Sequence, residues 1–230
     1  MANDLSAING GIAQASSTAG YSVRFESYFA TSDNLALALG RRPRVLHFCG
    51  HGIPGALVLE NERGGSVLAE VCGLCAPRGA SSRALINFVY GRAQVTALAR
   101  EFCAFGASTS LVFLAACKSA VAATGTYAVS MSVADALIFA GVKHVVAATR
   151  DLDDEHATMF TRTFYLHLLD GRTIFYAFRV ACSVLPLKAG SGTGSGLLLL
   201  PECVHNHDDP LIRCPHNVRR DALAPYRVRL

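Results

Sequence analysis

The sequence predicts an α/β fold, with a mostly parallel sheet and helices on both of its faces. Two apolar runs of strand length, at residues 45–48 and 111–116, each end abruptly in glycine or polar residues. Such runs are typical of buried strands that stop at the rim of a sheet. Segments with helical i, i+3, i+4 spacing lie between strand-like runs. Strands that alternate with helices favour a parallel sheet joined by right-handed crossovers.

The first half of the chain mixes strands, turns and helices. Residues 1–20 are rich in Ala, Ser and Gly and lack a clear period, which predicts a flexible lead-in. Ser32 or Asp33 is a suitable N-cap for a short helix. Residues 66–81 have the composition of a loop. The expected elements are strands at 21–29, 45–48 and 56–60, a turn at 61–65, and helices at 34–39 and 83–105.

The second half alternates strands and helices more regularly. Gly141 and Gly171 end two helical stretches, and the acidic residues at 153–155 suit a helix N-terminus. Residues 190–196 form a Gly/Ser connector. The expected elements are strands at 111–116, 142–149 and 197–200, helices at 131–140, 153–169 and 173–185, and an irregular tail at 201–230. We therefore expect one domain, at residues 21–200.

Composition limits the classes of protein and of partner. The chain has 230 residues, of which 51% are hydrophobic and 17% charged, which suffices for one sizeable core. The net charge of +4 comes largely from arginines near the C-terminus, without a basic face interleaved with aromatic residues. We therefore expect no nucleic-acid partner. The most apolar window, residues 133–149, contains Asp135, Lys143 and His144, so we also expect no transmembrane helix and no membrane partner.

The N-terminal sequence and the cysteines bear on the cellular compartment. The start MANDLSAINGG lacks the basic residues and apolar block of a signal peptide. Without an export signal, the eight cysteines are better interpreted as reduced thiols than as four disulfides. We expect an intracellular protein, in the cytoplasm.

A histidine and a cysteine follow the two apolar runs. His51 is flanked by two glycines after the first run, and Cys117 directly follows the second. The carboxyl ends of parallel strands share one edge of the sheet, so we expect the two side chains to be neighbours there. An imidazole can take the proton of a thiol and later pass it to a leaving amine. The N–H of Gly52 is a candidate donor to the developing oxyanion, with the Cys117 amide as a second.

These blocks resemble a known family. The segments HFCGHG (47–52) and LVFLAACKS (111–119) are similar to the His and Cys motifs of the caspase-like clan of cysteine peptidases. Within that clan they resemble most the CHAT domains, which are relatives of separase. The resemblance continues in the expected order over about residues 40–185.

The resemblance implies a caspase-like fold, a thiol protease activity and roles for particular residues. His51 would be the general base and Cys117 the nucleophile of a cysteine endopeptidase. Separase-like members prefer a basic P1 residue held by an acidic pocket, for which Asp151 is the matching candidate. CHAT domains usually carry Trp where this chain has Arg150, and their usual helical repeats have no counterpart here. The implied partners are a protein or peptide substrate and, as an open alternative, a regulatory protein.

Other interpretations of the same residues remain open. The chain could be a non-catalytic CHAT-type interaction or signalling module, or an enzyme that is inactive until a partner or a cleavage activates it. Residues 50–55 also fit the G-x-G-x-x-G pattern of dinucleotide binding, but the fingerprint requires a helix after the third glycine. Cys72 and Cys75 could join Cys and His residues of the tail in a zinc site, although the spacing fits no standard zinc motif. We therefore expect no cofactor and no metal.

Overall fold

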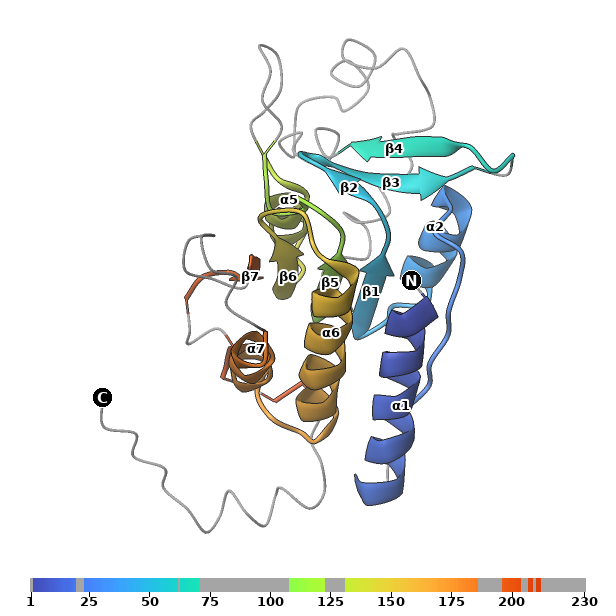
Figure 1. Ribbon diagram of the computed structural model, residues 1–230. Coiled ribbons are helices and arrows are strands. Elements are labelled where there is room, and N and C mark those ends of the chain that lie inside the picture. Colours follow the sequence, from blue (N-terminus) through green and yellow to red (C-terminus); the bar gives the residue numbers. More distant parts are fainter. Residues whose placement is uncertain are drawn as a thin grey trace. The chain divides into compact units, whose positions relative to one another are not determined.

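The fold was taken from a computed structural model, which describes residues 2–19, 23–61, 63–70, 108–122, 131–185, 196–203, 207–208 and 210–211. The chain divides into two compact units. We call Ser27–Asp153 with Gly194–Cys203 the sheet unit, and Met1–Glu26 with Asp154–Thr193 and Val204–Leu230 the helical unit. Figure 1 labels the elements of both.

The main sheet of the sheet unit has four strands in the order β1–β5–β6–β7. The strands β1, β5 and β6 run parallel, and β7 is antiparallel to β6. Their bounds are Val45–Cys49 (β1), Leu111–Ala115 (β5), His144–Ala148 (β6) and Leu197–Leu200 (β7). All five residues of β5 and all five of β6 are buried, as expected of central strands in a parallel sheet. The predicted mostly parallel sheet is confirmed.

A second, antiparallel sheet follows directly on β1 in the chain. It consists of β2 (Gly52–Ile53), β3 (Ala56–Glu60) and β4 (Ser66–Glu70). The β3–β4 turn is held by Asn61, whose Oδ1 accepts hydrogen bonds from the amides of Arg63 (3.0 Å) and Gly65 (2.7 Å). The expectation of a loop from residue 66 is wrong for β4. This short strand has no clear pattern in the sequence, and pairing with β3 over five residues stabilises it.

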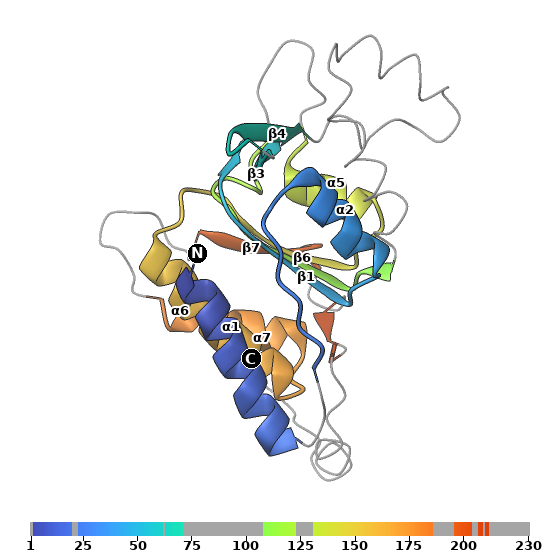
Figure 2. The ribbon, with the colours of Figure 1, turned by 90° about the vertical axis from the view of Figure 1, so that its right-hand side faces the viewer.

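Two short helices cover one face of the main sheet. Figure 2 shows α2 (Ser32–Gly40) and α5 (Val133–Phe139) on the same face. The cap of α2 is Thr31, one residue before the predicted caps, and its Oγ1 accepts from the Asn34 amide at 3.2 Å. At α5, Ser132 and Asp135 form a reciprocal capping box.

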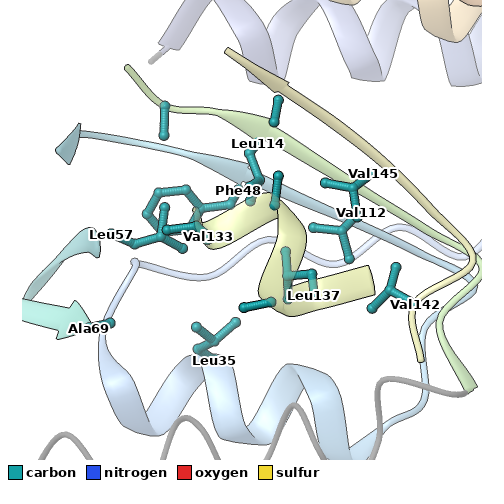
Figure 3. Packing of buried hydrophobic residues seen from close by; sticks show 14 of the residues in the cluster. Leu35, Phe48, Leu57, Ala69, Val112, Leu114, Val133, Leu137, Val142 and Val145 are labelled. Carbon is teal, nitrogen blue, oxygen red and sulfur yellow. The ribbon is translucent and has the colours of Figure 1, made fainter. Parts of the chain in front are cut away.

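The core of the sheet unit lies between these helices and the sheets. Alternate residues of β5 point to this face, in keeping with the two-residue period of a strand. Figure 3 shows how side chains of the helices meet those of the strands. The buried cluster includes Leu35 and Leu39 of α2, Val133 and Leu137 of α5, Phe48 of β1, Val112 and Leu114 of β5, Val145 of β6, and Leu57 and Leu59 of β3.

The helical unit contains α1 (Ala2–Ala19), α6 (Asp154–Leu169) and α7 (Ile174–Ser183). The prediction of a flexible lead-in at residues 1–20 is therefore wrong in its secondary structure. Gly11 of α1 lies against Tyr165 and Leu169 of α6, where an added Cβ would meet Leu169 at 3.7 Å. Gly11 has no side chain, so α1 can approach α6 closely there, and Ile8, three residues earlier, is also buried.

The helices after residue 153 confirm the predicted positions of α6 and α7. Their interface is aromatic: the rings of Phe160 and Phe178 meet edge to face, with centroids 5.7 Å apart. Burial raises the pKa of the Tyr165 hydroxyl above its ordinary value.

The first expected strand is the remaining local error. Residues 23–29 form no strand, and the chain reaches a sheet only at Thr31, which makes a parallel bridge to Glu60. The expected helix at 83–105, the connector at 190–195 and residues 212–230 of the tail lie outside the described residues. In the described part of the chain, no helix has the length and apolarity needed to cross a membrane.

Candidate active site

His51 and Cys117 follow the ends of two neighbouring parallel strands. The pairs from Val45↔Leu111 to Cys49↔Ala115 hold β1 and β5 in register, and the Gly50 amide extends the pairing with a 3.2 Å hydrogen bond to the Ala115 carbonyl. His51 and Cys117 each follow two residues after the last ladder pair, Cys49↔Ala115. The predicted placement on adjacent strand ends is confirmed. The catalytic roles remain predictions.

The turn that carries Cys117 is anchored to β6 and to the residues that follow it. The Lys118 amide donates to the Arg150 carbonyl (3.2 Å), and the Ala120 amide donates to the Ala148 carbonyl (2.8 Å). In return, the Ala148 amide donates to Oγ of Ser119 at 3.0 Å. The ladder pairs of β5 with β6 end at Phe113↔Val146, so the turn replaces the sheet pairing beyond that point. Cys117 is thus held on a turn whose backbone has little freedom.

Replacing Ser119 with alanine should destabilise this turn. The Ser119 side chain is fully buried, so the substitution leaves the Ala148 amide without its acceptor in a dry environment. An unsatisfied buried amide costs about 1–3 kcal/mol. Denaturant unfolding of Ser119→Ala should therefore show a free energy of unfolding lower by this amount. The exposed Ser183→Ala, at the end of α7, should change the free energy of unfolding by less than about 0.5 kcal/mol.

Gly52 packs directly against the backbone of Cys117. A Cβ on Gly52 would lie 2.5 Å from the Cys117 carbonyl oxygen and 3.1 Å from Cβ of Ala116. No side chain fits at the first of these distances. The second glycine of the G-H-G motif therefore serves the close approach of two backbones as well as the turn.

The direction of the Gly52 amide follows from the ladder between β2 and β3. The Val58 amide donates to the His51 carbonyl at 3.0 Å, which makes His51 and Val58 a hydrogen-bonded pair. Hydrogen-bonded and non-hydrogen-bonded pairs alternate in an antiparallel ladder. Gly52, paired with Leu57, is therefore at a non-bonded position, and its N–H is directed away from β3. This leaves the amide available to an oxyanion.

The sulfur of Cys117 has a backbone donor. The Leu152 amide donates a hydrogen bond to Cys117 Sγ at 3.5 Å, and the cysteine is half-buried. His51 is exposed, and in the described part of the chain no hydrogen bond joins its ring to this sulfur. The two groups are adjacent along the sheet edge but are not engaged.

Asp151, the candidate pocket acid, forms an ion pair with Lys118. The Lys118 Nζ lies 3.0 Å from Oδ2 of Asp151, and the two side chains are 42% and 70% exposed. Lys118 has a left-handed backbone, with φ of 53°. Non-glycine residues adopt such a φ uncommonly, and when they do, it is often at a functional turn. The structure thus brings Asp151 to the Cys117 turn, where its exposed carboxylate is paired with Lys118.

Two neighbours of the nucleophile turn were not singled out by the sequence pattern. Lys118 gives no signal, because nothing in the sequence predicts a left-handed lysine. Ser119 stands in the CKS motif, and a hydroxyl four residues after a buried strand could have suggested a side-chain acceptor. Arg150, where CHAT domains usually carry Trp, lies with its side chain over Gly196, whose φ of 72° suits glycine.

The structure bears on the two alternative sites, for a dinucleotide and for zinc. After Gly55 the chain enters the strand β3, whereas the dinucleotide fingerprint requires a helix there, so that interpretation is excluded. Cys72 and Cys75 of the zinc alternative lie outside the described residues. Among the residues whose positions the structure describes, no three His, Cys, Asp or Glu side chains gather as a metal site.

The fold and the paired strand ends define the class: an α/β domain with a histidine and a cysteine at one edge of a mostly parallel sheet. The sequence profile of the CHAT domain matches residues 2–189, and the chain belongs to this family. The family is related to the caspase-like peptidases. The match includes the residues of α1. No curated protein matches the sequence.

Proposed function

We propose that this CHAT domain is a cysteine endopeptidase in which Cys117 is the nucleophile and His51 the general base. The observation that supports it most is the register of β1 and β5, whose last pair, Cys49↔Ala115, lies two residues before His51 and Cys117. Neighbouring strands lie about 4.8 Å apart, a separation that two side chains can bridge by changing rotamers. The family membership supports the same assignment.

The reaction follows from these groups. The imidazole of His51 takes the thiol proton, and the thiolate of Cys117 attacks the carbonyl carbon of the substrate, forming a C–S bond and an oxyanion. The oxyanion collapses, the C–N bond breaks, and the imidazolium gives its proton to the departing amine. Water then attacks the thioester with His51 as base, releasing the carboxylic acid and regenerating the thiol. The Gly52 amide, directed away from β3, is the candidate donor to both oxyanions.

We assign to Asp151 the recognition of a basic P1 side chain. The carboxylate is exposed and lies beside the Cys117 turn, as its ion pair with Lys118 requires. An arginine side chain could make two parallel hydrogen bonds to such a carboxylate. The preferred substrate is therefore a protein or peptide with arginine or lysine before the scissile bond.

The removal of the base gives a direct test of this function. His51→Ala should lower kcat/KM for an arginyl fluorogenic peptide by about 10²–10⁴-fold, the usual contribution of a general base. Alkylation of Cys117 by iodoacetamide should also be slower in His51→Ala, because the variant lacks the base that takes the thiol proton. Equal cleavage by wild type and His51→Ala would contradict the proposal.

A second candidate function is a non-catalytic interaction module. Two observations favour it: the Leu152 amide donates a hydrogen bond to Cys117 Sγ, and among the described residues no hydrogen bond joins the His51 ring to that sulfur. A peptidyl acyloxymethyl ketone with P1 arginine separates the two functions, because it modifies only a thiol within an assembled peptidase site. Labelling confined to Cys117, with the exposed Cys203 unlabelled, supports the peptidase. Labelling of other cysteines and none at position 117 would favour the module.

A further inference from the structure

The residue after the nucleophile is a lysine whose charge faces the candidate specificity acid. Lys118 Nζ lies 3.0 Å from Asp151 Oδ2, on the carboxylate that a basic P1 side chain would have to contact. A cationic substrate group that binds Asp151 shares its carboxylate with Lys118 or displaces the lysine from it. The pair therefore bears on which substrates the site selects.

The backbone directs the lysine toward Asp151. Its φ of 53° turns the chain sharply after Cys117, and the turn is closed by the hydrogen bond from the Val121 amide to the Lys118 carbonyl at 2.9 Å. The Lys118 amide is bonded to the Arg150 carbonyl, directly before Asp151 in the chain. A backbone hydrogen bond thus joins residue 118 to residue 150, and the ion pair joins residue 118 to residue 151.

The strength of the pair follows from its exposure. Both side chains are substantially open to solvent, with 42% and 70% of their surfaces exposed. Ion pairs of this kind contribute little, because water and salt screen them and both side chains lose rotamer freedom. A substrate cation can therefore displace Lys118, but it gains less from Asp151 than it would from an unpaired carboxylate.

We propose that Lys118 is a specificity-determining residue that neutralises Asp151 and so weakens the selection for a basic P1 side chain. The inference rests on the proposed peptidase function and extends it to this one residue. The rates for substrates with neutral and with basic P1 residues therefore differ less than they would if Asp151 were unpaired.

The test compares two covalent probes of Cys117. They are peptidyl acyloxymethyl ketones that differ only at P1, one with arginine and one with norleucine. The ratio of their second-order labelling rates reports selection at P1. The intrinsic reactivity of the thiol enters both rates equally and cancels in the ratio.

Removing the charge of the lysine should raise this ratio. Lys118→Met, of similar length, should increase the arginine-to-norleucine ratio about 3- to 5-fold, as expected when an exposed ion pair no longer competes. Lys118→Arg keeps the charge and should leave the ratio within about 2-fold of wild type. Lys118→Gly also removes the charge and fits the left-handed backbone without steric cost, so it serves if the methionine variant folds poorly.

The outcomes separate the two levels of the proposal. A ratio that falls in Asp151→Asn but does not change in Lys118→Met or Lys118→Gly would overturn the role of Lys118 and leave the peptidase intact. An unchanged ratio in Asp151→Asn would overturn Asp151 as the P1 acid, and the lysine's role with it. No labelling of Cys117 in wild type or in any variant would overturn the peptidase function itself.

Discussion

Cys117→Ala is expected to abolish cleavage of an arginyl fluorogenic peptide while the protein remains folded. The thiol supplies the bond to the acyl intermediate, so no other group of the turn can replace it. In subtilisin, loss of the nucleophile alone removes about as much rate as loss of the whole catalytic set, which sets the scale for this residue at about 10⁶-fold. Activity in the variant should therefore fall to the background of the assay.

The stability of this variant serves as its control. Cys117 is only half-buried, so its replacement by alanine leaves no large cavity, and the anchoring hydrogen bonds of the turn come from other residues. The unfolding midpoint should stay close to that of wild type. Cys203→Ala, at an exposed cysteine, should keep full activity. Retained cleavage in Cys117→Ala would rule out the peptidase proposal.

Gly52→Ala has the second largest expected effect, on both stability and activity. The new Cβ would lie 2.5 Å from the carbonyl oxygen of Cys117, a backbone atom that cannot move away as a flexible side chain could. The two strand ends must separate, at a cost of about 1–3 kcal/mol or more. A shift of about 1 Å between reacting groups lowers a rate by about 100-fold. The free energy of unfolding, measured in denaturant, and kcat/KM should therefore both decrease.

The matched control is another glycine of the sheet unit. Gly40 is the last residue of α2, and an added Cβ there would meet nothing within 4 Å. Gly40→Ala should leave activity unchanged and should not lower the unfolding midpoint, since alanine is the better helix former. If Gly52→Ala behaved like Gly40→Ala, the close packing of Gly52 on the Cys117 backbone would be contradicted.

The sequence was most informative where elements are buried and regular. The strands β1, β5 and β6 are nearly continuous apolar runs, and their polar ends place His51 and Cys117 at one edge of the sheet. A pattern of this kind depends on burial alone, which the composition of a segment reports directly. The order of these elements therefore could be predicted, and with it the neighbourhood of the candidate site.

Elements that depend on distant partners could not be predicted. The helix α1 contacts α6 at Gly11 and has few apolar residues among its Ala, Ser and Gly, so its apolar stripe is weak in the sequence, and β4 depends on its pairing with β3. The ion pair of Lys118 with Asp151 needs a left-handed lysine, a local choice that tertiary hydrogen bonds impose. The position of Asp151 near Cys117 followed from family resemblance, not from any periodic pattern.

The anchoring of the Cys117 turn has a consequence for how the domain could diversify. Two of its hydrogen bonds to the β6 region join main-chain atoms alone, and the third uses the hydroxyl of Ser119. None of them involves the side chain at position 118. Substitutions at that position, natural or engineered, can therefore change substrate preference without removing the hydrogen bonds that hold Cys117 in place. We expect a library randomised at residue 118 to yield mostly folded proteins, with glycine, asparagine and aspartate tolerated best.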